Sequence, residues 1–312
     1  MNSLGYWISI VLLGFFGTAV LGLFFKWVDR LVTARIQWRK GPPLYQPLAD
    51  LLKLLGKETV VSERASLGLF LFAPVLGFIG TAVAAAILWA VAIDPTVSFT
   101  GDLIVVIYFL IFPSLALILA GSSSGSPHGG LGASREMKMV IGYELPFILG
   151  TVPVILAANG TFQLSAIVST QQSDGVMLLS VGGFLGFLCA LAAMQAKLAV
   201  VPFDQAEAET ELMGGVIMEY SGPPLALIHL TRAMLLFVLP MFVITVFWGG
   251  IQLTGWGLLS TVVKFLVLLV VIVLMRNTNP RLRIDQVLSF FWFIVTPVAL
   301  IACVLSVASY YA

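Results

Sequence analysis

The sequence predicts an all-α polytopic membrane protein with eight transmembrane helices in one membrane domain, residues 1–312. Three observations predict this fold class. Hydrophobic residues make up 60% of the chain and charged residues only 10%, whereas soluble domains are roughly 45–50% apolar and about 25% charged. Apolar runs of about 20 residues, long enough to cross a bilayer, recur along the whole chain. Lys and Arg are also confined almost entirely to alternate loops.

The eight apolar runs define the expected spans. We place them at 4–25, 66–93, 103–121, 139–158, 176–196, 225–248, 255–275 and 288–311. The first run is long and rich in Trp and Phe, and no small-residue cleavage site follows it. It is therefore expected to be a retained span and not a signal peptide.

The positive charges orient these spans. Fourteen of the sixteen Lys and Arg residues lie in loop 26–64 and in the loops after the third, fifth and seventh spans. The other three loops and both termini carry none. Because Lys and Arg favour the cytoplasmic side, these four loops are expected to be cytoplasmic and both termini outside. The protein is expected in the inner or plasma membrane. Arg232 and Lys264 remain inside predicted spans.

Loop 26–64 contains a second kind of helix. The RKGPP sequence at 39–43 stops regular structure. After it, Leu48, Leu51, Leu52 and Leu55 recur at helical spacing. This pattern predicts a cytoplasmic amphipathic helix lying at the membrane surface. It is either a helix of the lipid interface alone or a platform on which a soluble partner docks.

Loop 121–138 is expected to contain little helix, because Gly, Ser and Pro dominate the sequence GSSSGSPHGGLGASREMK. A backbone of this kind can approach another surface closely. His128 lies in this loop without a neighbouring Cys or His. We therefore interpret it as a hydrogen-bonded loop histidine and not as a metal ligand.

Cysteine usage limits the chemistry of the chain. Cys189 and Cys303 are isolated in apolar runs, with no CxxC motif and no Cys/His cluster. An iron–sulfur cluster or a Cys-ligated nickel or zinc site is therefore not expected in this chain. No nucleotide-binding glycine motif is present either. We expect no bound cofactor, no metal and no catalytic residue, so any redox centre belongs to a partner.

The loop 197–223 concentrates acidic residues. Its segment PFDQAEAETELMGGVIMEY, residues 202–220, holds five of the fifteen carboxylates: Asp204, Glu207, Glu209, Glu211 and Glu219. Charges beside lipid cost several kcal/mol each, so these acids are expected to move or gate protons or cations. On a helix, Glu207 and Glu211 would share a face and repel each other. A solvated acidic loop is the alternative.

Ionisable residues inside the spans extend this hypothesis. Glu144 lies in the fourth span, where an ionisable side chain is a functional candidate by default. Its expected partner is Arg232 or the pair of Glu207 and Glu211. Lys264 is either a structural counter-ion or part of a transport path. His229, one helical turn from Arg232, is either a core histidine or a member of the same path.

The acidic segment resembles a family signature. VPFDQAEAETELMGGVIMEYSG is similar to the PFDxxEaEsELvxGxxxEYsG motif of the membrane subunit of complex I that lies beneath the peripheral arm, the family also called NADH dehydrogenase subunit 1. The resemblance continues at RKGP…QPLADLLKLLGKE (39–58), GYE (142–144) and NPRLRIDQVLSFFW (279–292). The order of these motifs covers essentially the whole chain.

Two departures from the complex I pattern indicate a branch of the family. The chain runs directly from RKGPP to LYQP, and it has GSSSGSPHGGLGASRE after the third span. Both features resemble the homologous subunit of energy-converting membrane-bound nickel–iron hydrogenases and of the related membrane-bound sulfane sulfur reductase. They fall where quinone-using members form the quinone passage, so the resemblance argues against quinone binding.

The resemblance implies a non-catalytic subunit of an oxidoreductase complex. It would anchor the peripheral redox arm and couple electron transfer to proton or sodium translocation along buried carboxylates. By motif position, the path would comprise Glu144, Asp204, Glu207, Glu209, Glu211 and Glu219, with Arg232 and Lys264 as the cations inside the spans. The residues in motifs for docking to the arm would be Arg39, Asp50, Lys53, Glu58, Arg281 and Asp285.

The same resemblance implies partners and cofactors. Iron–sulfur and hydrogenase-like subunits of the peripheral arm would carry the iron–sulfur clusters and any nickel–iron centre. Antiporter-like membrane subunits would continue the ion path, and no nucleic acid is involved. Loop 276–287 would take part in docking.

Three other interpretations remain open on the residues alone: a true quinone-binding subunit of complex I, a self-sufficient secondary ion transporter and a purely structural anchor. A secondary transporter tends to show repeated halves with matching broken helices, and this sequence shows no such symmetry. A structural anchor leaves Glu144 unexplained.

Overall fold

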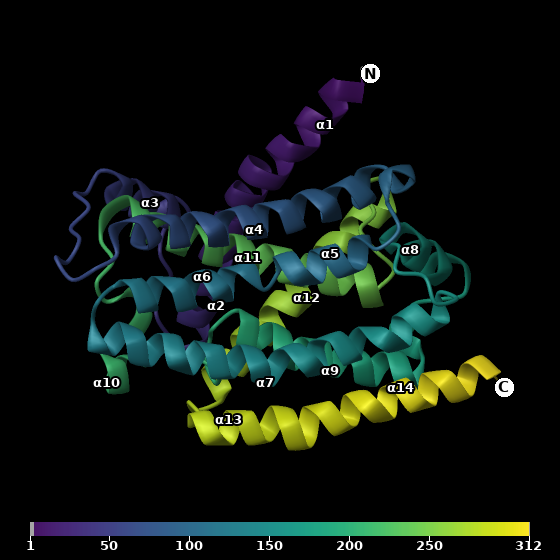
Figure 1. Cartoon of the computed structure of the whole chain (residues 1–312). Coiled ribbons are helices and arrows are strands. Elements are labelled where there is room, and N and C mark those ends of the chain that lie inside the picture. The colour runs from purple at the N-terminus through teal and green to yellow at the C-terminus, as the bar shows by residue number, and fades with distance from the viewer. Residues whose placement is uncertain (1–2, 312) are drawn as a thin grey trace.

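The computed structural model describes residues 3–311, apart from the side chains of 3–4, 209–210 and 309–311. Within this part of the chain every regular element is a helix, and no strand is present. The all-α fold class is therefore confirmed. Most of the long helices run in the same general direction and form one bundle (Figure 1).

The N-terminal segment is one continuous helical rod. It consists of α1 (Ser3–Leu12), a π-helical turn η1 (Leu13–Gly17) and α2 (Thr18–Ile36). The other long helices are α4 (Leu67–Ile93), α7 (Pro127–Ala157), α9 (Val181–Lys197), α11 (Gly222–Phe247) and α12 (Trp256–Thr278).

Two further rods are interrupted. The first contains α5 (Asp102–Phe109) and α6 (Phe112–Ser123), and the second contains α13 (Ile284–Phe290), a π-helical turn η5 (Phe291–Val295) and α14 (Thr296–Tyr311). The short elements are α3 (Gln46–Leu55), α8 (Leu164–Ser173), α10 (Glu209–Leu212) and the 3₁₀ turns η2 (Pro95–Val97), η3 (Met177–Leu179) and η4 (Gly215–Ile217).

Seven helical rods in the described residues are long and apolar enough to cross a membrane. They correspond to all the expected spans except 176–196. At that position the structure has α9, which is apolar but only 17 residues long. The membrane-embedded, multi-helix character of the protein is thus confirmed, and the number of spans stays a prediction.

Helix α11 is the centre of the bundle. Every residue from Ala233 to Phe247 is buried, which is the pattern of a helix that is hydrophobic on all faces. It packs mainly against α2 and α4. Gly22 of α2 allows the closest approach, because a Cβ there would lie 2.5 Å from the carbonyl oxygen of Ala233. From Ala233 to Phe247 the helix is therefore enclosed by neighbouring helices.

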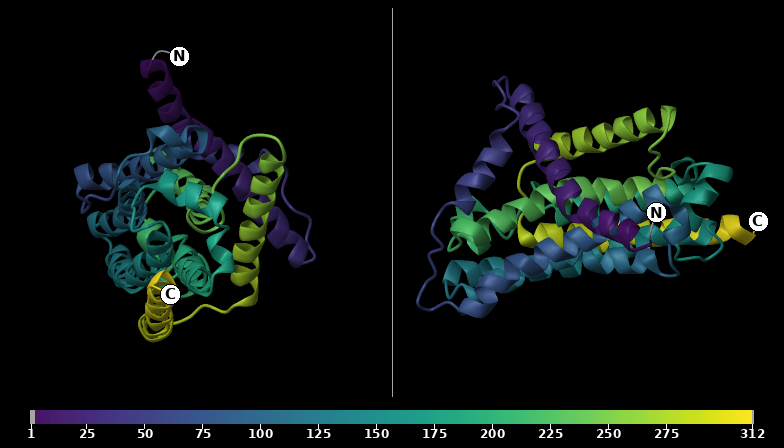
Figure 2. Two further views of the ribbon diagram at one scale, coloured as in Figure 1. Left: turned by 90° about the vertical axis from the view of Figure 1, so that its right-hand side faces the viewer. Right: turned by 90° about the horizontal axis from the view of Figure 1, so that it is seen from above.

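The bundle has two distinct ends. Helices α3 and α10 and the start of α13 lie at one end, and α8 and both termini lie toward the other (Figure 1). Helix α12 stands at the side of the bundle (Figure 2), where it packs against α2 and α11. The short elements at the first end carry the residues for which function is predicted.

Helix α3 confirms the predicted amphipathic helix. Leu48, Leu52 and Leu55 are exposed, and Leu51 is half-buried. Pro47 stands in the first turn, where a proline needs no helical hydrogen bond from its nitrogen. The helix therefore presents leucines outward from the bundle, and its position at the cytoplasmic membrane surface stays a prediction.

The expectation of little helix in 121–138 is wrong. Helix α6 continues to Ser123, and α7 begins at Pro127. Tertiary packing outweighs the poor helix propensity of glycine here. A Cβ on Gly129 would lie 3.0 Å from the carbonyl oxygen of Gly121, and a Cβ on Gly132 would lie 2.8 Å from that of Ala206. The glycines therefore serve close contact between helices and with the acidic segment.

Candidate functional site

The acidic segment, residues 202–220, is folded into the end of the bundle by its apolar residues. Ala206, Ala208, Leu212 and Val216 are buried. The ring of Tyr220 stacks on Phe70, with ring centroids 4.0 Å apart. This interleaving of apolar residues holds the backbone in place, so the segment is not a free solvated loop.

Three of its acids form ion pairs with cations from two helices and one loop. Asp204 accepts a hydrogen bond of 2.8 Å from Arg281. Glu207 pairs with Arg232 of α11, and Glu211 pairs with Arg135 of α7 at 2.5 Å. The side chain of Glu211 is 52% exposed, whereas Asp204 and Glu207 are largely enclosed. The acidic segment is therefore linked electrostatically to two long helices.

The predicted helical face shared by Glu207 and Glu211 does not form. Helix α10 begins at residue 209, and Glu207 lies in the turn before it. The buried contacts of Ala206 with Gly132 and Gly215 hold that turn in place. Each of the two glutamates instead has its own arginine, so mutual repulsion is not what defines the site.

Glu144 of α7 has a different partner from the ones predicted. Its carboxylate lies 2.5 Å from the ammonium group of Lys197, the last residue of α9. The Lys197 side chain is only 1% exposed and also lies over the rings of Tyr143 and Phe147. The expectation of Arg232 or the Glu207 and Glu211 pair is wrong, because α7 packs along α9 and brings the two residues together.

The second oxygen of Glu144 is buried and has no hydrogen-bond partner in the described structure. The ion pair with Lys197 uses only Oε2. Buried polar atoms without a partner are uncommon and are often associated with bound water or with function. Glu144 therefore retains a free acceptor inside the bundle.

Glu136 is a functional candidate that the sequence analysis missed. It is 4% exposed and lies on α7, within hydrogen-bonding reach of Ser114. The Ser114 hydroxyl is in turn 2.8 Å from that of Tyr143. Since α7 extends through 136, Glu136 and Tyr143 are seven residues apart on one helical face. The seven-residue spacing could have identified Glu136, but residue 136 was expected to lie in a loop and not in a helix.

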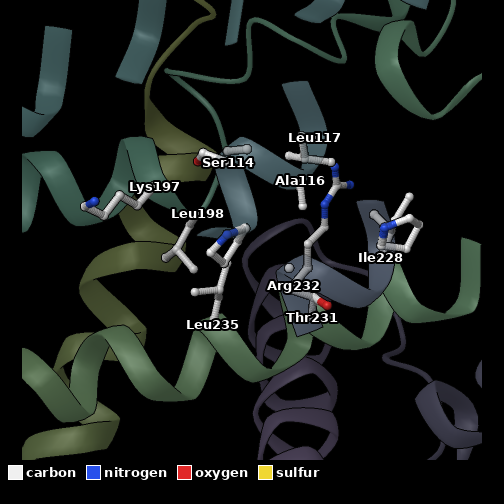
Figure 3. Close-up of a pocket in the computed structure, with 13 residues that line it drawn as sticks. Ser114, Ala116, Leu117, Lys197, Leu198, Ile228, Thr231, Arg232 and Leu235 are labelled. Atoms are coloured by element: carbon white, nitrogen blue, oxygen red, sulfur yellow. The ribbon is translucent and has the colours of Figure 1, made fainter. Parts of the chain in front are cut away.

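A small cavity separates the two groups of charges. It has a volume of about 20 Å³, enough for one or two water molecules. Lys197 lies at one side of it and Arg232 at the other, with Ser114 and Leu198 among the lining residues (Figure 3). The Nε of Arg232 is buried and has no partner among the described residues. A polar atom of this kind can donate a hydrogen bond to water in the cavity.

Two residues of the predicted path are not part of this arrangement. Lys264 of α12 donates hydrogen bonds to the backbone carbonyls of Trp248, at 2.6 Å, and Gly250, at 3.5 Å. It therefore caps the end of α11 that is far from the acidic segment. Glu219 is half-buried at the C-terminal end of the segment. The side chain of Glu209 lies outside the described residues.

The predicted docking residues lie around the same end of the bundle. Arg39, Lys53, Glu58 and Asp285 are exposed. Asp50 pairs with Arg30 at 2.8 Å. The hydrogen bond from Arg30 is the main cause that lowers the pKa of Asp50 below its usual value. Arg281, paired with Asp204, connects this surface to the acidic segment.

Metal ligands are not grouped anywhere in the part of the chain that the structure describes. Cys189 is buried and Cys303 half-buried, and both are free thiols. The chemistry that these residues can support is the transfer of protons among carboxylates, hydroxyls and enclosed cations.

Comparisons with known proteins agree with one another. Residues 8–307 match the family model described as NADH dehydrogenase. The chain is 32% identical to the H subunit of NADH-quinone oxidoreductase from Dehalococcoides mccartyi, over 93% of this chain and 82% of that protein. It is 34% identical to the corresponding protein of Syntrophotalea carbinolica, over 90% and 88% respectively.

A solved structure has the same fold. A chain of the membrane-bound sulfane sulfur reductase, an archaeal respiratory membrane complex, superimposes with a TM-score of 0.87 at 29% identity. The match covers 96% of this chain and 99% of that chain. The similarity of fold therefore extends over nearly the whole chain.

Proposed function

This chain belongs to the NADH dehydrogenase family, as the H-type membrane subunit of a complex-I-like oxidoreductase, and from that premise we propose its role. It anchors the peripheral redox arm and couples the arm's electron transfer to the translocation of protons or sodium ions. The redox chemistry takes place in partner subunits. This chain provides the enclosed carboxylates through which that chemistry acts on the membrane arm.

One observation carries the proposal: a series of enclosed polar groups leads from the acidic segment into the bundle. It starts at the Glu207–Arg232 pair and ends at the Glu144–Lys197 pair. Between them lie Glu136, Ser114 and Tyr143, together with a cavity of water size. Enclosed carboxylates, hydroxyls and water are the groups that relay protons within a membrane protein.

The ion pairs give the series two states. Protonation of Glu207 would release Arg232, and protonation of Glu144 would release Lys197. A change of charge or conformation at the redox arm, next to the acidic segment, would favour one state of the first pair. The enclosed position of these pairs strengthens their coupling, because a low local dielectric reduces screening. Electron transfer and ion movement would thus be linked through this chain.

We also propose how the helices cross the membrane. Eight spans, with α9 as the fifth, would place both termini outside and the end with α3, α10 and the start of α13 in the cytoplasm. The alternation of Lys and Arg among the loops supports this orientation. The position of both termini at the same end of the bundle agrees with an even number of spans (Figure 1). The complex would lie in the plasma membrane.

The partners follow from the surface around the acidic segment. The iron–sulfur and hydrogenase-like subunits of the arm would dock on α3 and on the loop before α13, through Arg39, Asp50, Lys53, Glu58, Arg281 and Asp285. Antiporter-like membrane subunits would receive the ion path beyond Glu144. Iron–sulfur clusters, and a nickel–iron centre if the complex has one, would be held by the arm.

Within the family we favour the type of the membrane-bound hydrogenase or sulfane sulfur reductase. The structural likeness to the sulfane sulfur reductase chain supports this choice. The curated relatives are named NADH-quinone oxidoreductases, so a quinone-binding subunit is the alternative. Identifying the catalytic subunit that co-purifies with this chain, and counting its nickel-ligating cysteines, distinguishes the types.

The experiment that tests the coupling is Glu144→Gln in the whole complex, reconstituted in liposomes. We expect electron transfer to persist and redox-driven ion uptake to fall roughly 10²-fold, because Gln cannot exchange the proton. The matched control is Glu63→Gln, which changes an exposed carboxylate outside the series. Uptake that is unchanged in Glu144→Gln would defeat the proposal.

A further inference from the structure

A second cavity lies between α2, α3 and α11 and shares Arg232 with the small one. It has a volume of about 520 Å³, within the range of about 300–1,000 Å³ that small-molecule sites occupy. Its lining comes from residues far apart in sequence, among them Lys26, Arg30, Asp50, Lys53 and Arg232. We call it the α3 recess.

The α3 recess is positively charged. Four of its lining residues are Lys or Arg, and Asp50 is the one acid among them. Asp50 is occupied by Arg30, and Arg232 by Glu207. Lys53 has no ion pair within the described residues and is exposed. An anion entering the recess would therefore meet cations that the protein's own acids do not fully neutralise.

Lys26 is the cation best placed for a ligand. It is partly exposed and lies 3.5 Å from Asp29. That carboxylate also accepts two hydrogen bonds from Arg276, at 3.0 and 3.1 Å. Asp29 therefore has a stronger partner than Lys26, and the ammonium group of Lys26 keeps donors for another acceptor.

The other part of the α3 recess is apolar. Leu23, Leu51, Leu54 and Leu230 contribute to its wall. Leucines continue outward along the exposed face of α3. The recess also lies where the first span ends, since Lys26 stands in the last third of the apolar rod 5–36. In the proposed topology, this is the depth at which phospholipid headgroups would meet their acyl chains.

We propose that the α3 recess binds one anionic phospholipid. Its phosphate would lie against Lys26, with Lys53 and Arg30 nearby, and its acyl chains would follow the leucines toward the bilayer. Charge complementarity and the apolar wall together select this occupant. A free phosphate would leave the leucines uncovered, and a zwitterionic lipid would leave the net positive charge of the recess without a counter-charge.

The lipid would connect the surface helix to the bundle. Helix α3 contacts both α2 and α11, and the recess lies between them. A lipid filling it would join α3 to Arg232, the residue where the α3 recess and the small cavity meet. The inference concerns binding alone and does not depend on the proposed coupling.

The test uses the whole purified complex in nanodiscs of phosphatidylcholine with a minor fraction of phosphatidylglycerol. After transfer to detergent, the lipids that remain bound are counted by native mass spectrometry. We expect one phosphatidylglycerol per complex to depend on Lys26. Removing one cation should reduce its retention roughly fivefold, since each Lys or Arg near an anionic headgroup contributes about 1 kcal/mol.

Three variants make the result specific. Lys26→Gln should reduce retention about fivefold while Asp29 keeps its hydrogen bonds from Arg276, and Lys26→Arg should retain the lipid. Lys53→Glu, an exposed charge reversal, should reduce retention further than Lys26→Gln. The matched control is Lys57→Gln, an exposed residue of the same loop outside the recess, which should retain the lipid fully.

Three results would overturn the proposal. Equal retention in wild type, Lys26→Gln and Lys53→Glu would show that no lipid depends on the recess. Equal retention of phosphatidylcholine at the same stoichiometry would remove the charge selection. Displacement of the bound lipid by millimolar inorganic phosphate alone would indicate a free-phosphate site.

Discussion

Charged groups at the two ends of the bundle are satisfied in different ways. At the end with the acidic segment, Glu144, Glu207 and Glu211 each meet a cation from another helix. At the far end, Asp102 accepts hydrogen bonds from the Ser98 hydroxyl, at 2.5 Å, and from the backbone of Leu164, at 2.7 Å. Lys264 likewise donates to backbone carbonyls.

This difference distinguishes charges with a structural role from charges with a proposed functional role. A charge held by backbone and hydroxyl groups fixes a loop or a helix end and has one stable arrangement. A charge held by an opposite charge on another helix, beside a cavity, has a second arrangement after proton transfer. Substitutions at the far end should therefore lower stability and spare translocation. Substitutions in the acidic end should affect translocation whatever they do to stability.

The largest expected effect tests the Glu144–Lys197 pair. Lys197→Met leaves the Glu144 carboxylate enclosed without a counter-charge, which should destabilise the subunit by about 3–5 kcal/mol. Thermal unfolding of the complex in detergent measures this loss. In the double variant Glu144→Gln with Lys197→Met, most of the stability should return, because no charge remains buried. Translocation should be absent in both.

A double variant as unstable as Lys197→Met would show that the lysine acts through its packing on Tyr143 and Phe147, and not through Glu144. Recovery of translocation in the double variant would show that ion translocation does not need the Glu144–Lys197 pair.

The next effect tests the far end. Asp102→Asn removes the charged acceptor of the hydrogen bonds from Ser98 and Leu164 and should cost about 1–3 kcal/mol of stability. Ion uptake per folded complex should equal that of wild type. Both are measured on the same preparation, by thermal unfolding and by uptake into liposomes. Reduced uptake in folded Asp102→Asn would mean that the two ends are not functionally distinct.

A smaller effect is expected at Glu136. Glu136→Gln keeps the side-chain shape beside Ser114 but cannot exchange a proton, so redox-driven uptake should fall on the order of tenfold. The unfolding temperature should change little, since an uncharged amide is less costly to bury than a carboxylate. The matched control is Glu63→Gln at the surface. Uptake equal to that of the control would remove Glu136 from the proposed series.

The smallest expected effect is a loss of stability of helix α3 at low pH. Arg30 lowers the pKa of Asp50, so their pair stabilises the docked position of α3 above the pKa of the free carboxyl, about 3.9. That contribution is lost as the pH falls through the lowered value of the folded protein. For a partly exposed pair it is worth less than about 1 kcal/mol.

Hydrogen exchange of residues 46–55 measures it. Protection should be constant near neutral pH and should decrease only in strong acid. The variant Asp50→Asn should show the reduced protection at every pH. A decrease that begins well above the pKa of a free carboxyl would indicate a different titrating group.

The features that follow from local pattern were predictable from the sequence. The helical class and α3 depend on hydropathy and spacing within a few turns, and both are confirmed. The partner of Glu144 was not predictable, because Lys197 is 53 residues away in sequence and stands at the expected edge of a loop. Long-range packing of α7 on α9 decides that contact.

Glu136 and the glycine-rich start of α7 were missed for one shared reason. Propensity alone assigns a segment with Gly129, Gly130 and Gly132 to a loop, because glycine loses more entropy in a helix than other residues. In the folded protein the glycines let α7 lie against Gly121 and Ala206. The stabilisation from this contact depends on residues distant in sequence. It therefore cannot be predicted from the residues around position 130 alone.

The length of α9 has a consequence for the surrounding bilayer. A helix of 17 residues is about 26 Å long, shorter than the hydrocarbon core of about 30 Å. A lipid-facing helix of this length would require local thinning of the membrane. From Ala193 to Lys197, however, every residue of α9 is buried in the protein. If α9 is the fifth of eight spans, as proposed, the end that carries Lys197 would therefore contact protein, chiefly α7 and α14, and not lipid.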